Sequence, residues 1–110
     1  MAVLTLQAHT AAPRHECTRR AADAIQAAGG FVADVRQFSN AALMLRFEVP
    51  ATALPAMGAG LAAAGVGLDA VSESALADRA LSGGEVDGTL HLRFYHGEPD
   101  LRIPTPAVPG

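Results

Sequence analysis

The sequence contains no lysine and only one cysteine, and both shortages narrow the class of protein. All eight basic residues are arginine, a bias typical of a GC-rich genome such as a bacterial one. A single cysteine cannot form an internal disulfide and fits a reducing compartment. No apolar run approaches the roughly 18 residues of a membrane-spanning helix. Neither a disulfide scaffold nor a membrane span is therefore expected.

Acidic residues outnumber basic ones, and this charge balance argues against nucleic acid as a partner. The net charge is −3 and the isoelectric point is about 5.7, whereas nucleic-acid-binding domains usually carry a basic patch. Residues 1–6 contain no charged segment and read as the start of a strand, so no signal peptide is expected. The predicted setting is cytoplasmic. At 110 residues, half of them hydrophobic, the chain predicts one folded unit with one core.

Hydrophobic periodicity predicts the order β-α-β-β-α-β across residues 2–71. Residues 2–9 alternate in polarity as a half-buried strand does. Apolar residues then recur at helical spacing from Cys17 to Ala28, and Gly29-Gly30 provides the glycine that commonly ends a helix. This order is typical of a split β-α-β sandwich, a two-layer α+β domain.

The second half of this unit is predicted from the same kind of pattern. Residues 31–38 and 43–49 alternate on either side of a Ser39-Asn40 turn and predict a hairpin. A second helix is expected over residues 52–64, although its two internal glycines weaken it by about 1 kcal/mol each. Residues 66–71 read as a weaker fourth strand.

Beyond residue 72 the pattern is looser. Residues 74–81 are compatible with a short helix, and residues 89–95 alternate as a fifth strand outside the six-element unit. Residues 99–110 hold four of the seven prolines and predict an extended tail. The predicted organisation is a domain over residues 1–72, an extension with the extra strand over 73–98, and the Pro-rich tail over 99–110.

Neither the cysteine nor the histidines have the spacing of a reactive or metal-binding site. Cys17 falls on the apolar stripe of its helix, and His15 two positions away does not face it, so a buried structural cysteine is predicted. His91 and His96 lie five apart, and His9, His15 and Cys17 match no common zinc spacing. No catalytic residue, metal or cofactor is predicted from these residues.

The solvent side of the predicted sheet carries polar and charged residues. They are Thr5, Gln7, Asp34, Arg36, Met44, Arg46 and Glu48. Charges of opposite sign on one sheet face are typical of a solvated or a pairing surface. Base-stacking aromatics are missing from these positions, which argues against an RNA-binding sheet.

The central segment resembles an ACT domain. The resemblance rests on residues 24–32 (AIQAAGGFV) and 37–48 (QFSNAALMLRFE), where a helix ends in Gly-Gly and is followed by a strand, a short turn and an apolar strand. It is strongest toward the ACT domains of formyltetrahydrofolate deformylases and related free-standing proteins, and it covers about residues 2–72. The resemblance implies a ferredoxin-like βαββαβ fold: an antiparallel sheet of order 4-1-3-2 with two helices on one face.

The resemblance also implies a function and a site. ACT domains pair, often edge to edge, and bind amino acids or other small ligands at the interface. Their ligands meet the loop after the first strand and the start of the second strand of the neighbouring domain. The implied ligand-binding residues in this chain are His9, Thr10, Ala11, Ala12, Pro13, Arg14, Gly30, Phe31 and Asp34. Arg14 would meet the carboxylate of an amino acid, and Asp34 its ammonium group.

The favoured hypothesis is therefore a non-catalytic regulatory module that forms a homodimer and binds a small ligand, such as an amino acid, or a partner enzyme. One alternative is a small enzyme of the dimeric α+β barrel kind, with a pocket between the sheet and the helices. His91, Arg93 and Tyr95 would be the ligand-facing residues of that pocket. Another is a pure protein–protein interaction domain, which predicts no small ligand. The fifth strand is expected either to extend the sheet or to cross to the partner.

Overall fold

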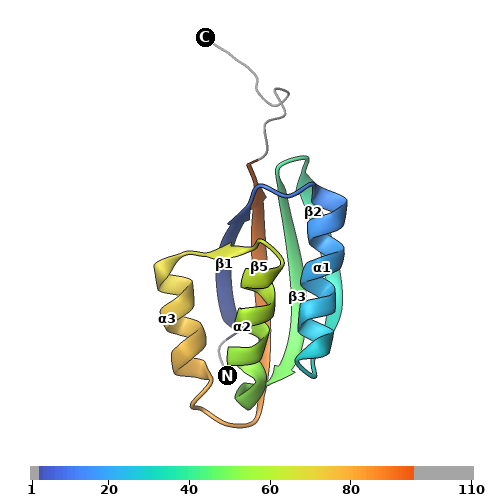
Figure 1. Ribbon diagram of the computed structural model, residues 1–110. Helices are drawn as coiled ribbons and strands as arrows, with labels where there is room; N and C mark the ends of the chain where they lie inside the picture. Colours follow the sequence, from blue (N-terminus) through green and yellow to red (C-terminus); the bar gives the residue numbers. More distant parts are fainter. Residues whose placement is uncertain (1–2, 96–110) are drawn as a thin grey trace.

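The computed structural model describes residues 3–95, which form five strands and three α-helices (Figure 1). The elements are β1 (Leu4–Thr10), α1 (Arg14–Ala27), β2 (Phe31–Ser39), β3 (Ala42–Pro50), the 3-10 turn η1 (Ala51–Ala53), α2 (Leu54–Ala63), β4 (Gly67–Leu68), α3 (Ala70–Arg79) and β5 (Glu85–Phe94). The predicted α+β class and the βαββαβ-like element order are confirmed. The predicted tail, residues 99–110, lies outside the described residues.

The sheet differs from the one that the resemblance implies. Its order is β2-β3-β5-β1-β4, not the 4-1-3-2 order of a ferredoxin-like sheet. It is also mixed rather than antiparallel, because β5 runs parallel to β1 and antiparallel to β3. Following the pairings across the sheet, β2 runs in the same direction as β1. Read from the β4 edge, the four expected strands keep the order 4-1-3-2, with β5 inserted between β1 and β3. The expectation of a wholly antiparallel sheet was wrong.

The fifth strand is the largest correction. It was expected as an addition outside the six-element unit, yet β5 lies in the middle of the sheet between β1 and β3. It begins at Glu85 rather than at residue 89, and its register joins Leu90 to Leu6 on one side and to Leu45 on the other. The three leucines are fully buried. β5 therefore fills the centre of the sheet between β1 and β3, and its apolar side chains belong to the same core as theirs.

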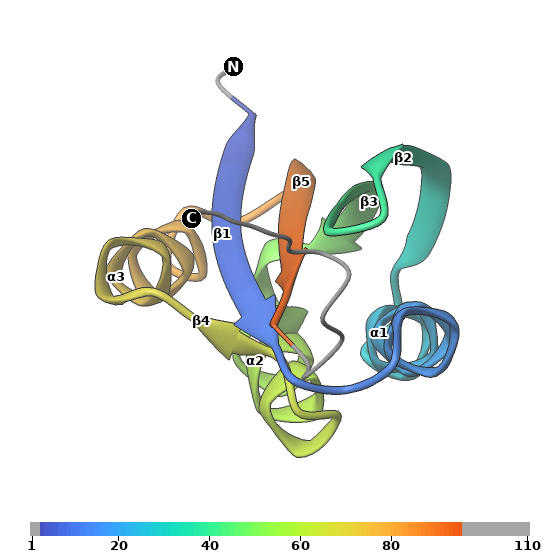
Figure 2. The same cartoon turned by 90° about the horizontal axis from the view of Figure 1, so that it is seen from above.

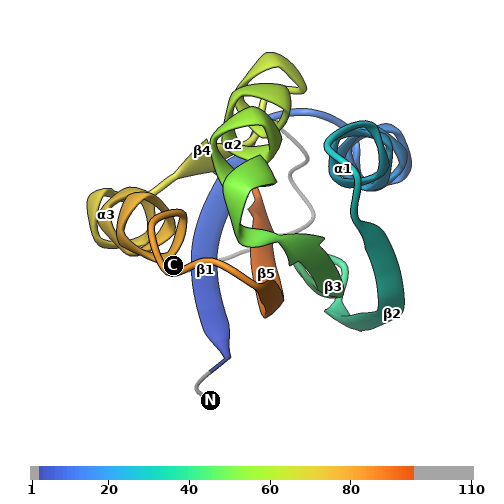
Figure 3. The same cartoon turned by 90° about the horizontal axis from the view of Figure 1, so that it is seen from below.

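Three helices, rather than the two expected, cover one side of the sheet (Figures 2 and 3). The third is α3, which begins at Ala70, four residues before the short helix anticipated from the sequence. Its start shortens the predicted fourth strand to Gly67–Leu68, because the side chain of Asp69 caps the helix by accepting a hydrogen bond from the backbone N–H of Ser72. The side of the sheet away from the helices is called the open face below.

Alternation along each strand separates the core from the open face. The predicted inward residues of β1 and β3 are buried, among them Leu6 and Phe47, and so are the apolar positions of β5. Gly29, at φ +100°, ends α1 in a conformation that residues with a Cβ resist. Gly60 of α2 lies so close to Ala24 of α1 that a Cβ there would come within 3.0 Å. This glycine lets the two helices pack closely, which offsets its low helix propensity.

The predicted hairpin is confirmed, and β2 forms one edge of the sheet. Its pairing with β3 is irregular between Val32 and Asp34 and again between Gln37 and Ser39. Bulges of this kind twist an edge strand and make it a poor template for adding another strand. No helix among the described residues is long and apolar enough to cross a membrane.

Candidate functional site

Polar side chains gather on the open face where β1 and β5 end. Gln7 and His9 of β1 lie in register with His91 and Arg93 of β5. Because β1 and β5 are parallel neighbours, these four side chains point to the same side of the sheet. The central position of β5 therefore creates a cluster that the sequence-based sheet order would have kept apart.

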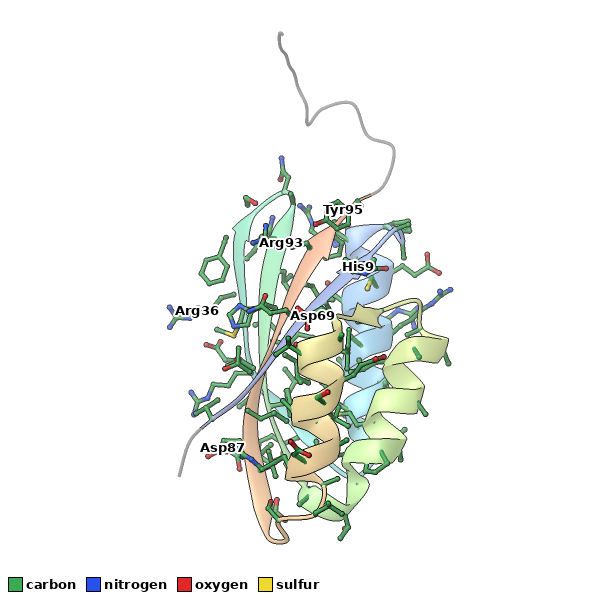
Figure 4. All side chains as sticks on the ribbon, turned by 90° about the vertical axis from the view of Figure 1, so that its left-hand side faces the viewer. His9, Arg36, Asp69, Asp87, Arg93 and Tyr95 are labelled. Atoms are coloured by element: carbon green, nitrogen blue, oxygen red, sulfur yellow. The ribbon has the colours of Figure 1, made fainter. Side chains whose placement is uncertain are left out.

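A hollow of about 250 Å³ opens beside this cluster. It is lined by Gln7, Ala8, His9, Asp69, Arg93 and Tyr95. Figure 4 shows His9, Arg93 and Tyr95 near one end of the sheet, with Asp69 at the adjoining end of α3. The lining thus combines cationic, anionic and aromatic groups from β1, β5 and the start of α3.

The imidazole of His9 is held on two sides. Its ring lies 6.0 Å from the ring of Tyr95, centroid to centroid, with 53° between the planes. On its other side it rests on Gly67 of β4, where a Cβ would come within 3.0 Å of the His9 Cε1 atom. Gly67 therefore makes room for His9, and Tyr95 limits the directions in which its ring can turn.

Asp69 provides the negative charge of the hollow. Its Oδ1 accepts a hydrogen bond of 2.7 Å from the backbone N–H of Ser72. That bond is the main reason why the pKa of Asp69 lies below its usual range, and the Ser72 hydroxyl and the nearby His9 lower the pKa further. The carboxylate is therefore ionised at neutral pH, and it is exposed at the end of the helix.

Arg93 and Asp69 line the hollow with opposite charges, yet neither belongs to a protein ion pair within residues 3–95. The ion pairs found there join Arg19 to Asp23, Arg20 to Glu16, and Arg36 to Asp34. A guanidinium group matches the geometry of a carboxylate, and a carboxylate accepts hydrogen bonds from an ammonium group. The arrangement suits a small ligand that carries both groups.

The base of the hollow is tied to β1 through Ser72. The backbone N–H of Gln7 donates a 2.7 Å hydrogen bond to the buried Ser72 hydroxyl, and the Gln7 carbonyl accepts a 3.0 Å bond from the N–H of Asp69. The start of α3 thus serves as a hydrogen-bonding partner for β1 next to the two-residue strand β4. This connection sets the position of Asp69 relative to Gln7 and His9.

Replacing Ser72 by alanine should therefore destabilise the protein. The Gln7 N–H would lose its acceptor in a buried setting, which costs about 1–3 kcal/mol. Such a loss lowers the melting temperature by roughly 4–8 °C per kcal/mol in a domain near this size. Ser74→Ala is the matched control, since Ser74 is exposed on the same helix. Equal melting temperatures for the two variants in thermal denaturation would contradict the role of Ser72.

The loop implied by the resemblance lies at the same end of the sheet, but only part of it reaches the hollow. His9 lines the hollow, whereas Thr10 is buried and its hydroxyl accepts a 3.1 Å bond from the N–H of Ala12. Ala11 and Pro13 are exposed. The guanidinium of Arg14 donates to the side chain of Asn40 at 3.2 Å, at the tip of the β2–β3 hairpin.

The other implied residues lie at the opposite end or along the edge. Gly30 packs against Val49 and the Glu48 carbonyl oxygen, and Phe31 is 52% exposed. Since β2 runs in the direction of β1, the start of β2 lies at the end of the sheet away from His9. Asp34 accepts a 3.2 Å bond from the Arg36 guanidinium. Within one chain, the structure does not bring Arg14 and Asp34 together.

Several residues of the hollow were not among the predicted ligand-binding residues. Arg93 and Tyr95 were named only for the alternative enzyme, and Gln7 only as part of the open face. Asp69 was missed because residues 66–71 were read as a strand. An aspartate directly before an amphipathic segment is a helix-start signal, and it could have indicated this position.

Cys17 and the histidines add no second site among the described residues. Cys17 is free and fully buried, as predicted, and burial is the main reason why the pKa of its thiol is raised. Such a thiol is a poor nucleophile. No group of three or more His, Cys, Asp or Glu side chains that could hold a metal occurs in the described part of the chain.

Comparisons with known proteins gave no similarity on which to base a function. No family model matches the chain, and neither a curated protein nor a solved structure matches it.

Proposed function

We propose that this protein is a non-catalytic regulatory module that binds a small zwitterionic ligand, of the amino-acid class, and acts as a homodimer. The observation that carries the proposal is the hollow at the ends of β1 and β5, where Arg93 and Asp69 offer opposite charges without a protein ion pair among the described residues. Arg93 would bind the ligand carboxylate, and Asp69 would accept from its ammonium group.

His9 and Tyr95 complete the proposed site. Their rings form an aromatic wall that can contact the ligand side chain, and the Tyr95 hydroxyl adds a donor or acceptor. His9 is the one residue shared with the site that the ACT resemblance implies. The likeness of residues 24–48 to ACT domains supports the same class of regulatory ligand binding, although the observed sheet order departs from that fold.

The enzyme alternative would need a pocket between the sheet and the helices. Apolar side chains fill that layer, among them Ile25 of α1, Met57 of α2 and Leu76 of α3. His91 and Arg93 instead point to the open face, away from the helices. The geometry therefore supports binding at the edge of the open face better than catalysis inside the two layers.

A thermal-shift panel of the twenty amino acids tests the proposal first. A ligand at a hundred times its dissociation constant stabilises the folded protein by about 2.7 kcal/mol, which raises the melting temperature by roughly 10 °C or more. The ligand found is then compared with its two singly charged analogues, one without the amino group and one without the carboxylate. Both analogues should bind more weakly, because each leaves one charge of the hollow without a partner.

Arg93→Gln should weaken binding of that ligand at least about tenfold, since a hydrogen bond to a charged group contributes about 1.5–3 kcal/mol. Isothermal titration calorimetry measures the loss. Arg19→Gln is the matched control, because Arg19 is an exposed arginine on α1 outside the hollow. If no amino acid changes the melting temperature, the interaction-domain alternative replaces this proposal.

A further inference from the structure

The strand registers arrange the open face in four rows that run across the sheet. Each row takes one residue from β1, β5, β3 and β2 in turn. The rows are His9, Arg93, Ala42 and Ser39; Gln7, His91, Met44 and Arg36; Thr5, Thr89, Arg46 and Asp34; and Val3, Asp87, Glu48 and Phe31. The last row includes Val3, which precedes β1 and continues its alternation. No helix of the described chain covers these rows (Figures 2 and 3).

Charge is distributed unevenly between the two ends of this face. The row of His9 contains Arg93 and no acidic residue. The row at the other end contains Asp87 and Glu48, which lie directly opposite each other on neighbouring strands. Figure 4 shows Arg93 and Asp87 near opposite ends of the sheet. Among the four rows, one end therefore carries a cation, Arg93, and the other end carries two carboxylates, while Asp69 of the hollow lies beside the first of these ends.

The two carboxylates of the anionic end repel each other. Like charges directly opposite each other on adjacent strands destabilise a sheet. Neither Asp87 nor Glu48 belongs to an ion pair among residues 3–95. A cation from outside the chain would relieve this repulsion, and the cationic end of a second copy carries one.

The two middle rows carry Arg36 and Asp34, which form an ion pair with each other, and Arg46. Met44, Thr89 and His91 lie there and are half-buried, while Arg36 and Asp34 lie along the β2 side. This composition suits contact with another flat surface. The free edge of β2 is a less suitable one, because its two register irregularities interrupt the straight hydrogen-bonding edge that a second strand would need.

We propose that two copies of this chain associate through their open faces, stacked with the strands of one copy antiparallel to those of the other. The proposal rests on the homodimer of the proposed function and specifies its surface and orientation. A twofold axis across the strands, between the rows of Met44 and Arg46, places the cationic end of each copy over the anionic end of its partner. Arg93 then faces the partner's Asp87, and its five N–H donors allow it to contact this carboxylate together with the carboxylate of a ligand in the hollow. Arg36 faces the partner's Asp34.

The other way of stacking the two faces is excluded by charge. With the twofold axis along the strands, each row lies over the same row of the partner. With this axis between β5 and β3, the acidic row would meet itself, so that Asp87 lies over the partner's Glu48 twice in each dimer. Juxtaposed like charges oppose association strongly. The pattern of charges therefore selects the antiparallel arrangement.

This arrangement has a consequence for the ligand site. It brings the start of β2 of one copy to the same end of the dimer as the His9 loop of the other. Gly30 and Phe31 of the partner subunit thereby share an end with the loop of residues 9–14. Within one chain, the two halves of the site implied by the resemblance, the loop of residues 9–14 and the start of β2, lie at opposite ends of the sheet. In the dimer, one half from each copy lies at the same end.

A charge exchange between Arg36 and Asp34 tests the orientation without altering the hollow, because neither residue lines it. In an Arg36→Glu homodimer, each Glu faces the partner's Asp34. In an Asp34→Arg homodimer, each new Arg faces the partner's Arg36. Either variant alone should raise the dissociation constant of the dimer at least about a hundredfold, since the repulsion occurs twice. A one-to-one mixture should form heterodimers, because both contacts again join opposite charges.

Sedimentation velocity measures the oligomeric state of each variant and of the mixture, and Arg19→Glu on α1 is the control that should remain dimeric. Circular dichroism checks that every variant is folded. A monomeric wild-type protein would overturn the homodimer itself. A dimeric wild type whose single variants stay dimeric, or whose mixture stays monomeric, would overturn this orientation and leave the homodimer and the ligand site in place.

Discussion

A chain that ends at Gly84 is expected to be unfolded, because it lacks the central strand of the sheet. β5 hydrogen-bonds to β1 on one side and to β3 on the other. Its buried apolar side chains are Val86, Leu90, Leu92 and Phe94. Burial of each large apolar side chain contributes about 1.5–3 kcal/mol, so their removal costs an amount comparable with the whole stability of a domain, about 5–15 kcal/mol.

Circular dichroism and thermal denaturation measure this loss. A chain that ends at Tyr95 is the control, since it retains every element of the described structure. It is expected to melt cooperatively, near the temperature of the full chain. Cooperative melting of the shorter chain would show instead that residues 1–84 fold without β5, as an independent six-element unit would.

Replacing Gly88 by alanine should be among the most destabilising single changes to a small residue in this protein. Gly88 of β5 lies directly opposite Phe47 of β3, and a Cβ on Gly88 would overlap the Phe47 ring. Phe47 is fully buried, and since protein cores are close-packed its ring has little room to move. Overpacking of this kind costs about 1–3 kcal/mol or more, so a fall in melting temperature of roughly 4–24 °C is expected.

Gly58→Ala is the control for this substitution. A Cβ at Gly58 would lie 3.5 Å from Leu76, an ordinary contact, and Gly58 is within α2. Alanine there should raise stability by about 1 kcal/mol through helix propensity. Combining Gly88→Ala with Phe47→Leu should cost less than the sum of the two single changes, because the smaller side chain relieves the clash. Additive effects would show that the ring does not pack on Gly88.

Features that depend on residues close together in the chain could be predicted from the sequence. The alternation of β1, β3 and β5, the apolar stripe of α1 and the Gly29 helix end depend on side chains a few positions apart. The inward and outward faces of these strands were therefore predicted correctly, including five residues of the open face on β1 and β3. The burial of Cys17 followed from its place on the same stripe.

Only part of the hollow could be predicted from the sequence. His9 was named through the resemblance, but its neighbours come from elements far along the chain, with Arg93 more than 80 positions away. Asp69 belongs to the site only because it follows the two-residue strand β4 and caps α3. Each of these residues has an ordinary local setting, so no local pattern marks them as neighbours.

By itself, the sequence determined most of the segments that become strands and helices and the apolar side of β1, β3 and β5, since both are set by residues close together in the chain. Only the tertiary structure decided that β5 lies between β1 and β3. An alternating strand can satisfy its apolar face at the edge or in the centre of a sheet, and its backbone accepts any neighbour that matches its register. The fit of Gly88 beneath Phe47, and the leucines of β5 against those of β1 and β3, select the central position. That choice places Arg93 beside His9, and it leaves the rows of the open face with a cation at one end and two carboxylates at the other.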